Sequence, residues 1–278
     1  LPLFRKIAAS TVPVIIEGET GTGKEVLAES IHETSARSKG PFVVFDCTAV
    51  PASLMESELF GHEKGAFTGA TNSRAGFFEQ AHGGTLLIDE IGDLDPQLQP
   101  KLLRAIERHE IRRVGGQKPI PIDVRLLAAT RRDLDRAIQE GRFRDDLYHR
   151  LAVARVELPP LRKRRGDVRV LVAHFCRELG GPNASVPAER LAAWERAEWP
   201  GNVRQLRNAV ARWLALGELG EGMTDDGPQS SALPEVSSQV VVPSAIPPFA
   251  SDPIEAILKQ NLPLPVARLR VVEAFEAR

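Results

Sequence analysis

The chain has 278 residues, of which 42% are hydrophobic, enough for one large domain or for a large and a small one. Lys and Arg number 36 against 37 Asp and Glu, so the whole chain lacks the positive charge typical of nucleic-acid binding. There is no signal-peptide pattern and no apolar run near the roughly 18 residues of a membrane span. Two separated cysteines, Cys47 and Cys176, favour a reducing, cytoplasmic setting. Because residue 1 is leucine, we expect the chain to be a piece of a longer protein.

Short apolar runs alternate with helical patterns over residues 1–161. The predicted strands cover residues 12–16, 41–47, 85–91, 124–130 and 153–158. A helical pattern follows the first strand, and another covers residues 97–110. This alternation predicts an α/β domain whose parallel sheet is covered by helices on both faces.

The strand signal stops near Arg162, and three helical patterns follow up to residue 219. We expect residues 162–219 to form a second, all-helical domain. Residues 220–253 are rich in Ser, Pro, Gly and acidic side chains, a composition that predicts a flexible linker. Helical patterns resume in residues 254–278.

A glycine-rich segment follows the first strand and opens a helix. Its residues are Gly18, Glu19, Thr20, Gly21, Thr22, Gly23, Lys24 and Glu25. Backbone N–H groups of such a loop wrap anionic phosphates, and Lys24 would reach the β and γ oxygens of a nucleotide. Glu25 stands where a magnesium-binding Ser or Thr is usual. The alternative is a glycine-rich turn without a ligand.

Asp89 and Glu90 stand at the carboxyl end of a predicted buried strand, the edge at which open α/β sheets bind ligands. Asp89 could hold magnesium, and Glu90 could orient and polarise a water molecule. An acidic pair at this place can also be a helix cap, but the loop around Lys24 favours hydrolysis.

Three arginines, Arg142, Arg144 and Arg150, fall on or near a short predicted helix in "GRFRDDLYHRL". They are candidates for arginine fingers, which neutralise charge developing on a γ-phosphate. The alternative is a solvated basic face. If the fingers act on a neighbouring subunit, the protein has to form a ring.

The segment "GAFTGA" comprises Gly65, Ala66, Phe67, Thr68, Gly69 and Ala70. An aromatic side chain between two glycines suits a transient contact, because it offers a large surface with few rotamers to restrict. Alternatively, Phe67 folds back into the core.

Motifs in this order resemble one known family, the central AAA+ ATPase domain of sigma-54-dependent transcriptional activators, also called bacterial enhancer-binding proteins. The matching segments, within about residues 1–217, are "GETGTGKE", "ELFGHEKGAFTGA", "GGTLLIDEI", "RVGG", "FRDDLYHRL", "LPPLR" and "WPGNVRQLRN". The resemblance implies a P-loop NTPase that forms a hexameric ring, binds ATP and Mg²⁺, and remodels the closed complex of sigma-54 RNA polymerase until promoter DNA opens.

Site roles follow from the same resemblance. Lys24 grips phosphate, Asp89 holds magnesium and Glu90 activates water, while Arg144 and Arg150 match fingers that act in trans. The resemblance further assigns Arg204 as the sensor of the helical lid, residues 112–117 as a second pore loop, and Phe67 with Thr68 as the sigma-54 contact. In this family Glu25 is ordinary, and enhancer DNA is bound by a C-terminal module beyond residues 254–278.

Two residues depart from the family pattern at the place where the γ-phosphate is sensed. Arg131 follows Thr130 where Asn is common, and Asp46 replaces the usual switch Asn. An ionised Asp46 cannot donate a hydrogen bond to Glu90, so the two carboxylates would repel or share a proton, unless Arg131 screens them.

Two other functions stay open: a different AAA+ remodeller, which "GAFTGA" disfavours, and a nucleotide-gated binding module with weak turnover.

Overall fold

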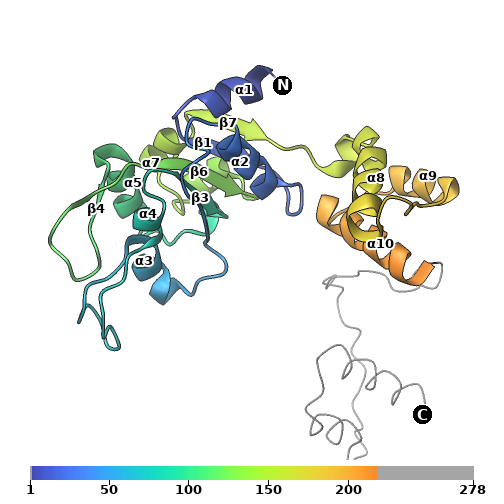
Figure 1. The fold of residues 1–278 in the computed structure, drawn as a ribbon. Coiled ribbons are helices and arrows are strands. Elements are labelled where there is room, and N and C mark those ends of the chain that lie inside the picture. The colour runs from blue at the N-terminus through green and yellow to red at the C-terminus, as the bar shows by residue number, and fades with distance from the viewer. Residues whose placement is uncertain (1, 218–278) are drawn as a thin grey trace, which may run out of the picture. The chain divides into compact units, whose positions relative to one another are not determined.

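The computed structural model describes residues 2–217. The predicted linker at 220–253 and the predicted helices in 254–278 lie outside the described residues. Within the described part the chain forms an α/β portion followed by a bundle of helices (Figure 1). No helix among residues 2–217 is both long enough and apolar enough to cross a membrane.

The centre of the α/β portion is a parallel sheet, as predicted. Among the described residues its strands are β1 (Val14–Glu17), β2 (Phe42–Asp46), β3 (Thr85–Asp89), β6 (Arg125–Thr130) and β7 (Ala154–Glu157). They lie in the order β2-β3-β6-β1-β7, and each neighbouring pair is parallel. Every carboxyl end therefore meets the same edge, which brings the loops after β1, β3 and β6 together.

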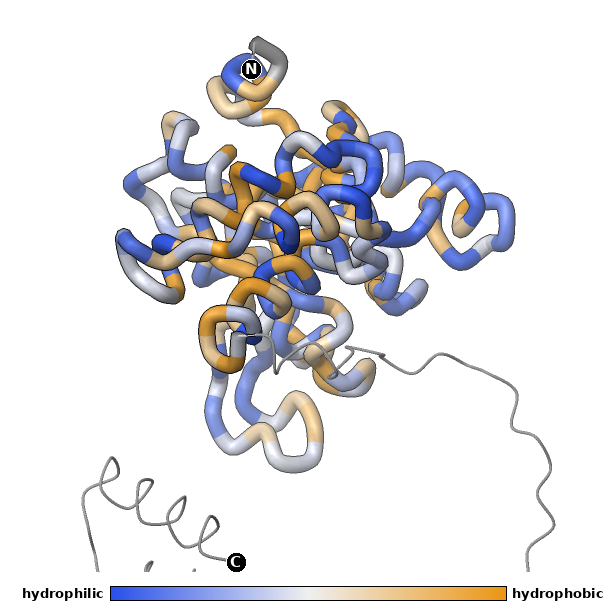
Figure 2. Tube along the Cα trace, turned by 90° about the vertical axis from the view of Figure 1, so that its right-hand side faces the viewer, coloured by the Kyte–Doolittle hydropathy of each residue, from blue (hydrophilic) through white to orange (hydrophobic). Residues whose placement is uncertain are grey.

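Alternate residues of the strands face opposite sides of the sheet, so both faces are apolar. Ile15 and Ile88 belong to one buried cluster, whereas Ile16 and Leu87 belong to another. The first cluster packs beneath α3 (Ala52–Phe60), α5 (Gln99–Arg108), α6 (Leu134–Gln139) and α7 (Asp145–Leu151), and the second beneath α1 (Pro2–Ala9) and α2 (Lys24–Glu33). Figure 2 shows the corresponding apolar segments, in orange, concentrated in the interior.

Between α3 and α4 (Phe77–Gln80) the chain forms a long loop over residues 61–76. A second loop, residues 112–119, connects the short antiparallel strands β4 (Glu110–Ile111) and β5 (Ile120–Pro121). The sequence patterns did not predict α1, α3, α6 or this pair of strands. In Figure 1 both loops extend from the same side of the α/β portion, far from the label of α1.

The helical portion contains α8 (Gly166–Gly180), α9 (Ala188–Arg196) and α10 (Asn202–Leu216), close to the three predicted helical patterns. It has its own buried core, which includes Val172, Phe175, Trp199 and Leu206. A separate core is what a small second domain needs in order to fold as a unit.

Candidate nucleotide site

The glycine-rich loop lies between β1 and α2, as the sequence predicts. Lys24 is only 7% exposed, and its Nζ donates hydrogen bonds to the carbonyl oxygens of Gly18 (3.0 Å) and Glu19 (3.4 Å). The ammonium group is therefore held inside the loop, where phosphate oxygens could replace the two carbonyls. This arrangement suits a P-loop lysine, which binds phosphate as a point charge.

The acidic pair lies beside this lysine. Glu90 Oε1 is 3.6 Å from Lys24 Nζ, and both side chains are largely buried. Glu90 has a φ of 51°, which is uncommon for a residue other than glycine and typical of strained functional positions. Asp89 ends β3, and its Oδ1 accepts a hydrogen bond from the Glu90 N–H at 2.9 Å. The structure thus brings together the three side chains assigned to phosphate, metal and water.

A cavity of about 750 Å³ opens at this edge of the sheet. The glycine-rich loop, the acidic pair and side chains of α8 and α10 line it, among them Phe175 and Arg204. Its volume lies in the range of small-molecule sites, and it combines apolar walls with a few polar groups. Adenine and ribose could contact the apolar side while phosphates reach Lys24, so the residues fit an adenine nucleotide.

Magnesium would depend on Asp89 with few protein ligands. Among residues 2–217 no group of three or more His, Cys, Asp or Glu side chains is arranged to hold a metal ion. Magnesium often keeps several waters and is bound by one or two carboxylates together with substrate phosphates. The donor set around Asp89 fits that mode of binding, with nucleotide and water completing the shell.

The proposed switch residues lie at the carboxyl ends of β2 and β6, the two strands that flank β3 in the sheet. The N–H of Arg131 donates to Glu90 Oε2 at 3.0 Å, and its guanidinium Nε lies 3.9 Å from that oxygen. Thr130 is fully buried, and its hydroxyl accepts from the N–H of Arg132. Asp46 Oδ1 instead accepts from the N–H and the hydroxyl of Thr48, each at 2.7 Å. In this structure Arg131 contacts Glu90, while the carboxylate of Asp46 is engaged by Thr48.

A double-mutant cycle tests whether Asp46 and Arg131 compensate each other. Asp46→Asn alone should change the rate of ATP turnover, because Asp46 lies in register with Asp89 at the carboxyl edge of β2 and β3. Combined with Arg131→Asn, it should recover more turnover than the single changes predict, by a coupling of about 1 kcal/mol or more. Additive effects of the two substitutions on the turnover rate would show that the two residues act independently.

The helical portion contacts the glycine-rich loop through residues that the sequence analysis did not single out. Arg162 donates to both carboxylate oxygens of Glu19, at 2.8 and 2.6 Å, and Asn202 Nδ2 donates to Glu19 at 3.2 Å. These hydrogen bonds, chiefly that of Arg162, lower the pKa of Glu19 to about 2. Because this folded-state pKa lies below the ordinary value of 4.5, the stabilisation is complete above about pH 4.5 and lost as pH falls toward 2.

Asn202 and the backbone around it extend the same contact. Its amide also donates to the Thr20 carbonyl at 3.0 Å, and the N–H of Val203 donates to the Gly21 carbonyl at 2.9 Å. A Cβ at Gly21 would lie 2.4 Å from the Gly201 carbonyl oxygen, so only glycine permits this close approach. Glycines in such a loop predict phosphate binding, but nothing in the sequence shows that Gly21 also packs against the helical portion.

Arg144 and Arg150 lie on α7 or at its start, and among the described residues neither lines the nucleotide cavity. Arg144 is half exposed and pairs with Asp146, which raises its pKa, while Arg150 pairs with Glu107 at 3.0 Å. Arg142 pairs with Glu140. The chain's own site is thus assembled without these arginines.

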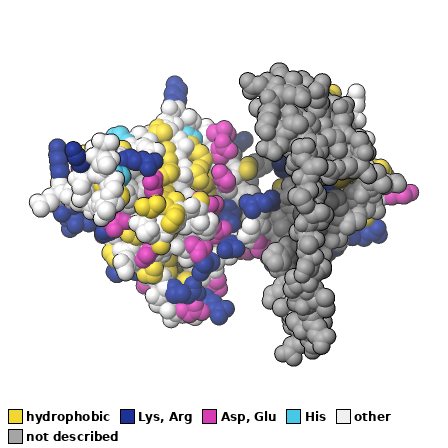
Figure 3. Space-filling model, turned by 90° about the horizontal axis from the view of Figure 1, so that it is seen from below, with side chains coloured by type: hydrophobic (Ala, Val, Ile, Leu, Met, Phe, Trp, Pro, Cys, Tyr) yellow, Lys and Arg dark blue, Asp and Glu magenta, His cyan; other side chains and the backbone are white. Residues whose placement is uncertain are grey.

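Phe67 is 41% exposed, so the alternative in which it folds into the core is wrong. Its ring meets His62 edge to face, with centroids 5.1 Å apart. Gly65 and Gly69 flank it with φ values of 82° and 103°, conformations that other residues rarely adopt. Seen from below in Figure 3, a white region of backbone and polar uncharged side chains at the left edge of the described part is bordered by Lys and Arg side chains in blue.

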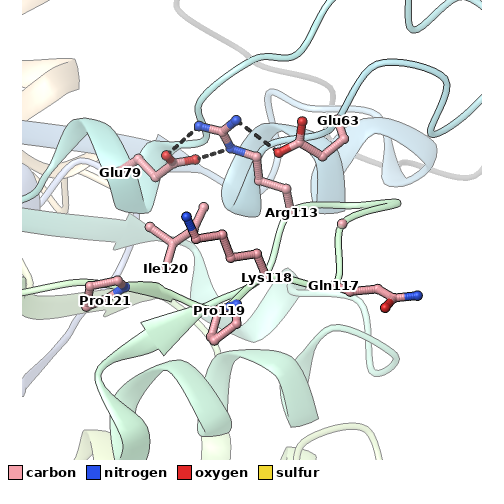
Figure 4. A pocket seen from close by; sticks show the side chains of 9 residues that line it. Glu63, Glu79, Arg113, Gln117, Lys118, Pro119, Ile120 and Pro121 are labelled. Atoms are coloured by element: carbon pink, nitrogen blue, oxygen red, sulfur yellow. Dashed lines mark hydrogen bonds and ion pairs between the residues drawn. The ribbon is translucent and has the colours of Figure 1, made fainter.

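The bases of the two loops are joined. Glu63 N–H donates to the Val114 carbonyl at 3.0 Å, and Val114 N–H donates to the Gly61 carbonyl at 2.9 Å. Arg113 contacts both Glu79, at 2.8 and 2.7 Å, and Glu63, at 3.1 Å, beside a cavity of about 610 Å³ (Figure 4). The second loop should therefore move together with the loop that carries Phe67.

Comparisons with known proteins agree with this geometry. Residues 1–157 match the family model of the sigma-54 interaction domain, and residues 162–229 match that of the AAA+ ATPase lid domain. The chain belongs to the family of AAA+ domains of sigma-54-dependent transcriptional activators.

Two relatives and two solved structures illustrate the match. The chain is 48% identical to the DNA-binding transcriptional regulator NtrC of Salmonella typhimurium, over 81% of this chain and 52% of that protein. It is 50% identical to the regulatory protein AtoC of Escherichia coli, over 76% of this chain and 47% of that protein. The chain thus spans about half the length of these relatives.

Crystal structures of NtrX from Brucella abortus show the same fold. The complex of NtrX with ATP has a TM-score of 0.71 and 36% identity, over 81% of this chain and 51% of that one. The complex with ADP has a TM-score of 0.73 and 33% identity, over 97% of this chain and 58% of that one. The AAA+ fold predicted from the sequence is therefore confirmed.

Proposed function

We propose that this chain is an ATP-hydrolysing motor that remodels the closed complex of sigma-54 RNA polymerase so that promoter DNA opens. The observation that best supports this proposal is the exposure of Phe67 on a loop of an AAA+ domain. In the same domain the P-loop lysine, Lys24, lies beside Glu90 of the acidic pair. Family membership and the ATP and ADP complexes of the related NtrX structures support the proposal.

The chain's own residues divide the work of hydrolysis. Lys24 and the backbone amides of the glycine-rich loop bind the phosphates, and Asp89 holds Mg²⁺. Glu90 orients the attacking water, and Arg204, which lines the cavity from α10, reports nucleotide to the lid. When bound, ATP would supply free energy through hydrolysis to ADP and phosphate, and this free energy would move the loops.

Arg144 and Arg150 complete the site of a neighbouring subunit in this proposal. Their exposure and their separation from the chain's own cavity support action in trans. A closed ring of subunits, of which we expect six as in the family, would place α7 of each subunit against the nucleotide of its neighbour. Turnover per subunit should therefore rise with protein concentration.

The loop around Phe67 is the proposed contact with sigma-54. In this proposal Glu90 and Arg131 respond to nucleotide at the carboxyl edge of the sheet. The joined loops of residues 61–76 and 112–119 present Phe67 outside the nucleotide cavity. This proposal assigns no enhancer-DNA contact to this chain, in line with its nearly neutral charge.

Replacing Phe67 by alanine tests the contact. Phe67→Ala should retain most ATP turnover, because the side chain is exposed and outside the nucleotide cavity. It should abolish stable capture of sigma-54 in the presence of a transition-state analogue of ATP hydrolysis, measured by native gel shift. Val153→Ala, which truncates another exposed apolar residue, is the matched control. Capture equal to that of the unmodified chain would exclude Phe67 as the contact.

A further inference from the structure

Gln99 connects the proposed arginine finger to the segment that follows the acidic pair. It is the first residue of α5 and is fully buried. Its Nε2 donates to the carbonyl oxygens of Leu94, at 3.3 Å, and Arg142, at 3.0 Å. Its Oε1 accepts from the N–H of Arg144 at 2.8 Å. A buried amide with three main-chain partners is a strong constraint on the position of all three segments.

One partner of Gln99 lies just after the catalytic edge. Glu90 is followed by a 3-10 turn (Ile91–Asp93), in which Asp93 N–H donates to the Glu90 carbonyl at 2.8 Å. Leu94 comes next, is itself buried, and presents its carbonyl to Gln99. A short, hydrogen-bonded stretch of backbone therefore connects Glu90 to the Gln99 amide.

The other two partners form the platform of the finger. Arg142 and Arg144 flank Phe143, which is only 3% exposed and anchors the loop in the core. Arg144 is the N-cap residue of α7 and has extended backbone angles, so its N–H is free of the helix and available to Gln99. Gln99 thus fixes the backbone from which the half-exposed guanidinium of Arg144 projects.

We propose that Gln99 is a positioning residue for Arg144, the finger presented to a neighbouring subunit. Through Gln99, the position of the Arg144 backbone would depend on the state of the chain's own nucleotide site. This inference rests on the proposed action of Arg144 in trans. Gln99 does not line the nucleotide cavity and would act through its main-chain contacts with Leu94, Arg142 and Arg144. Its loss should therefore damage the finger while leaving the chain's own site competent to bind nucleotide.

Gln99→Met tests this, because methionine has a similar length but cannot donate a hydrogen bond and its thioether accepts only weakly. We expect turnover to fall by about 10²-fold, the cost of a catalytic group displaced by about 1 Å. The dissociation constant for a fluorescent ADP analogue should stay within about 3-fold of the unmodified value, because Gln99 does not line the nucleotide cavity. A variant whose fold is merely destabilised would bind the analogue more weakly as well. Gln97→Met is the matched control, because Gln97 lies two residues earlier with its side chain exposed.

Mixing subunits separates a damaged finger from a damaged site. Gln99→Met subunits should regain activity with Glu90→Gln subunits, which keep intact fingers, and should regain none with Arg144→Ala subunits. Gln99→Glu provides a second variant of the same shape; its carboxylate still accepts from Arg144 but cannot donate, and it should show the same mixing pattern.

Each result of the mixing experiment is decisive. Rescue of Arg144→Ala but not of either Gln99 variant by Glu90→Gln subunits would overturn the role of Gln99 and leave the trans finger intact. Full activity of the Gln99 variants without mixing would also overturn the role of Gln99 and leave the trans finger intact. If Arg144→Ala itself is not rescued, the trans finger fails, and the inference about Gln99 fails with it.

Discussion

Arg144→Ala is expected to lower the maximal rate of ATP turnover by about 10³-fold, the lower end of the range for arginine fingers. The physical reason is the loss of a cation that would neutralise charge on the γ-phosphate in the adjacent subunit. Arg144 is half exposed on a buried platform, so its removal should leave the fold unchanged. Phosphate release at saturating ATP, over a dilution series of the chain, measures the effect.

Arg136→Ala is the matched control, because Arg136 is an exposed arginine on α6 that pairs with Glu140. It should keep turnover within about 2-fold, as expected for a surface ion pair. The unmodified chain should show specific activity that rises with concentration. Specific activity that is flat across dilution, together with no rescue on mixing with Glu90→Gln subunits, would contradict action in trans.

Glu90→Gln is expected to lower turnover by about 10²- to 10⁴-fold, the contribution of a positioned general base. Glutamine has the same shape and can still accept the N–H of Arg131, but its neutral amide cannot polarise water. ATP binding should remain, because Lys24 and the glycine-rich loop are intact. Single-turnover phosphate release and equilibrium binding of a fluorescent ATP analogue measure the two quantities separately.

Lys24→Ala is the informative partner of this variant. It removes the buried cation of the P-loop, so it should weaken nucleotide binding itself as well as turnover. A Glu90→Gln chain that loses ATP binding to the same degree, or that keeps turnover within a few-fold, would show that Glu90 has a structural role only.

The sequence was sufficient to predict the sheet and the centre of the nucleotide site. Buried parallel strands are continuous apolar runs such as "TLLIDEI", and their shared carboxyl edge follows from their direction. Lys24 and Glu90, far apart in the chain, could therefore be placed together, and they lie 3.6 Å apart.

Other elements have no comparable signal. The strands β4 and β5 have two residues each, too few for a periodic pattern, and α3 ends where the loop of residues 61–76 begins. The contacts of Gln99 with Arg142 and Arg144, and of Asn202 with Thr20, join segments distant in sequence, so the residue types alone do not predict them. Asp46 shows the limit of analogy, since its carboxylate lies against Thr48 in this structure.

Promoter opening tests the central claim most directly. The unmodified chain, at a concentration high enough for assembly, would be mixed with sigma-54 RNA polymerase holoenzyme on promoter DNA, and strand separation would be followed with a fluorescent base analogue. The account predicts opening with ATP, none with a non-hydrolysable analogue, and none with Phe67→Ala despite its retained ATP turnover. Equal opening by Phe67→Ala, or no opening by an unmodified chain that hydrolyses ATP, would contradict it.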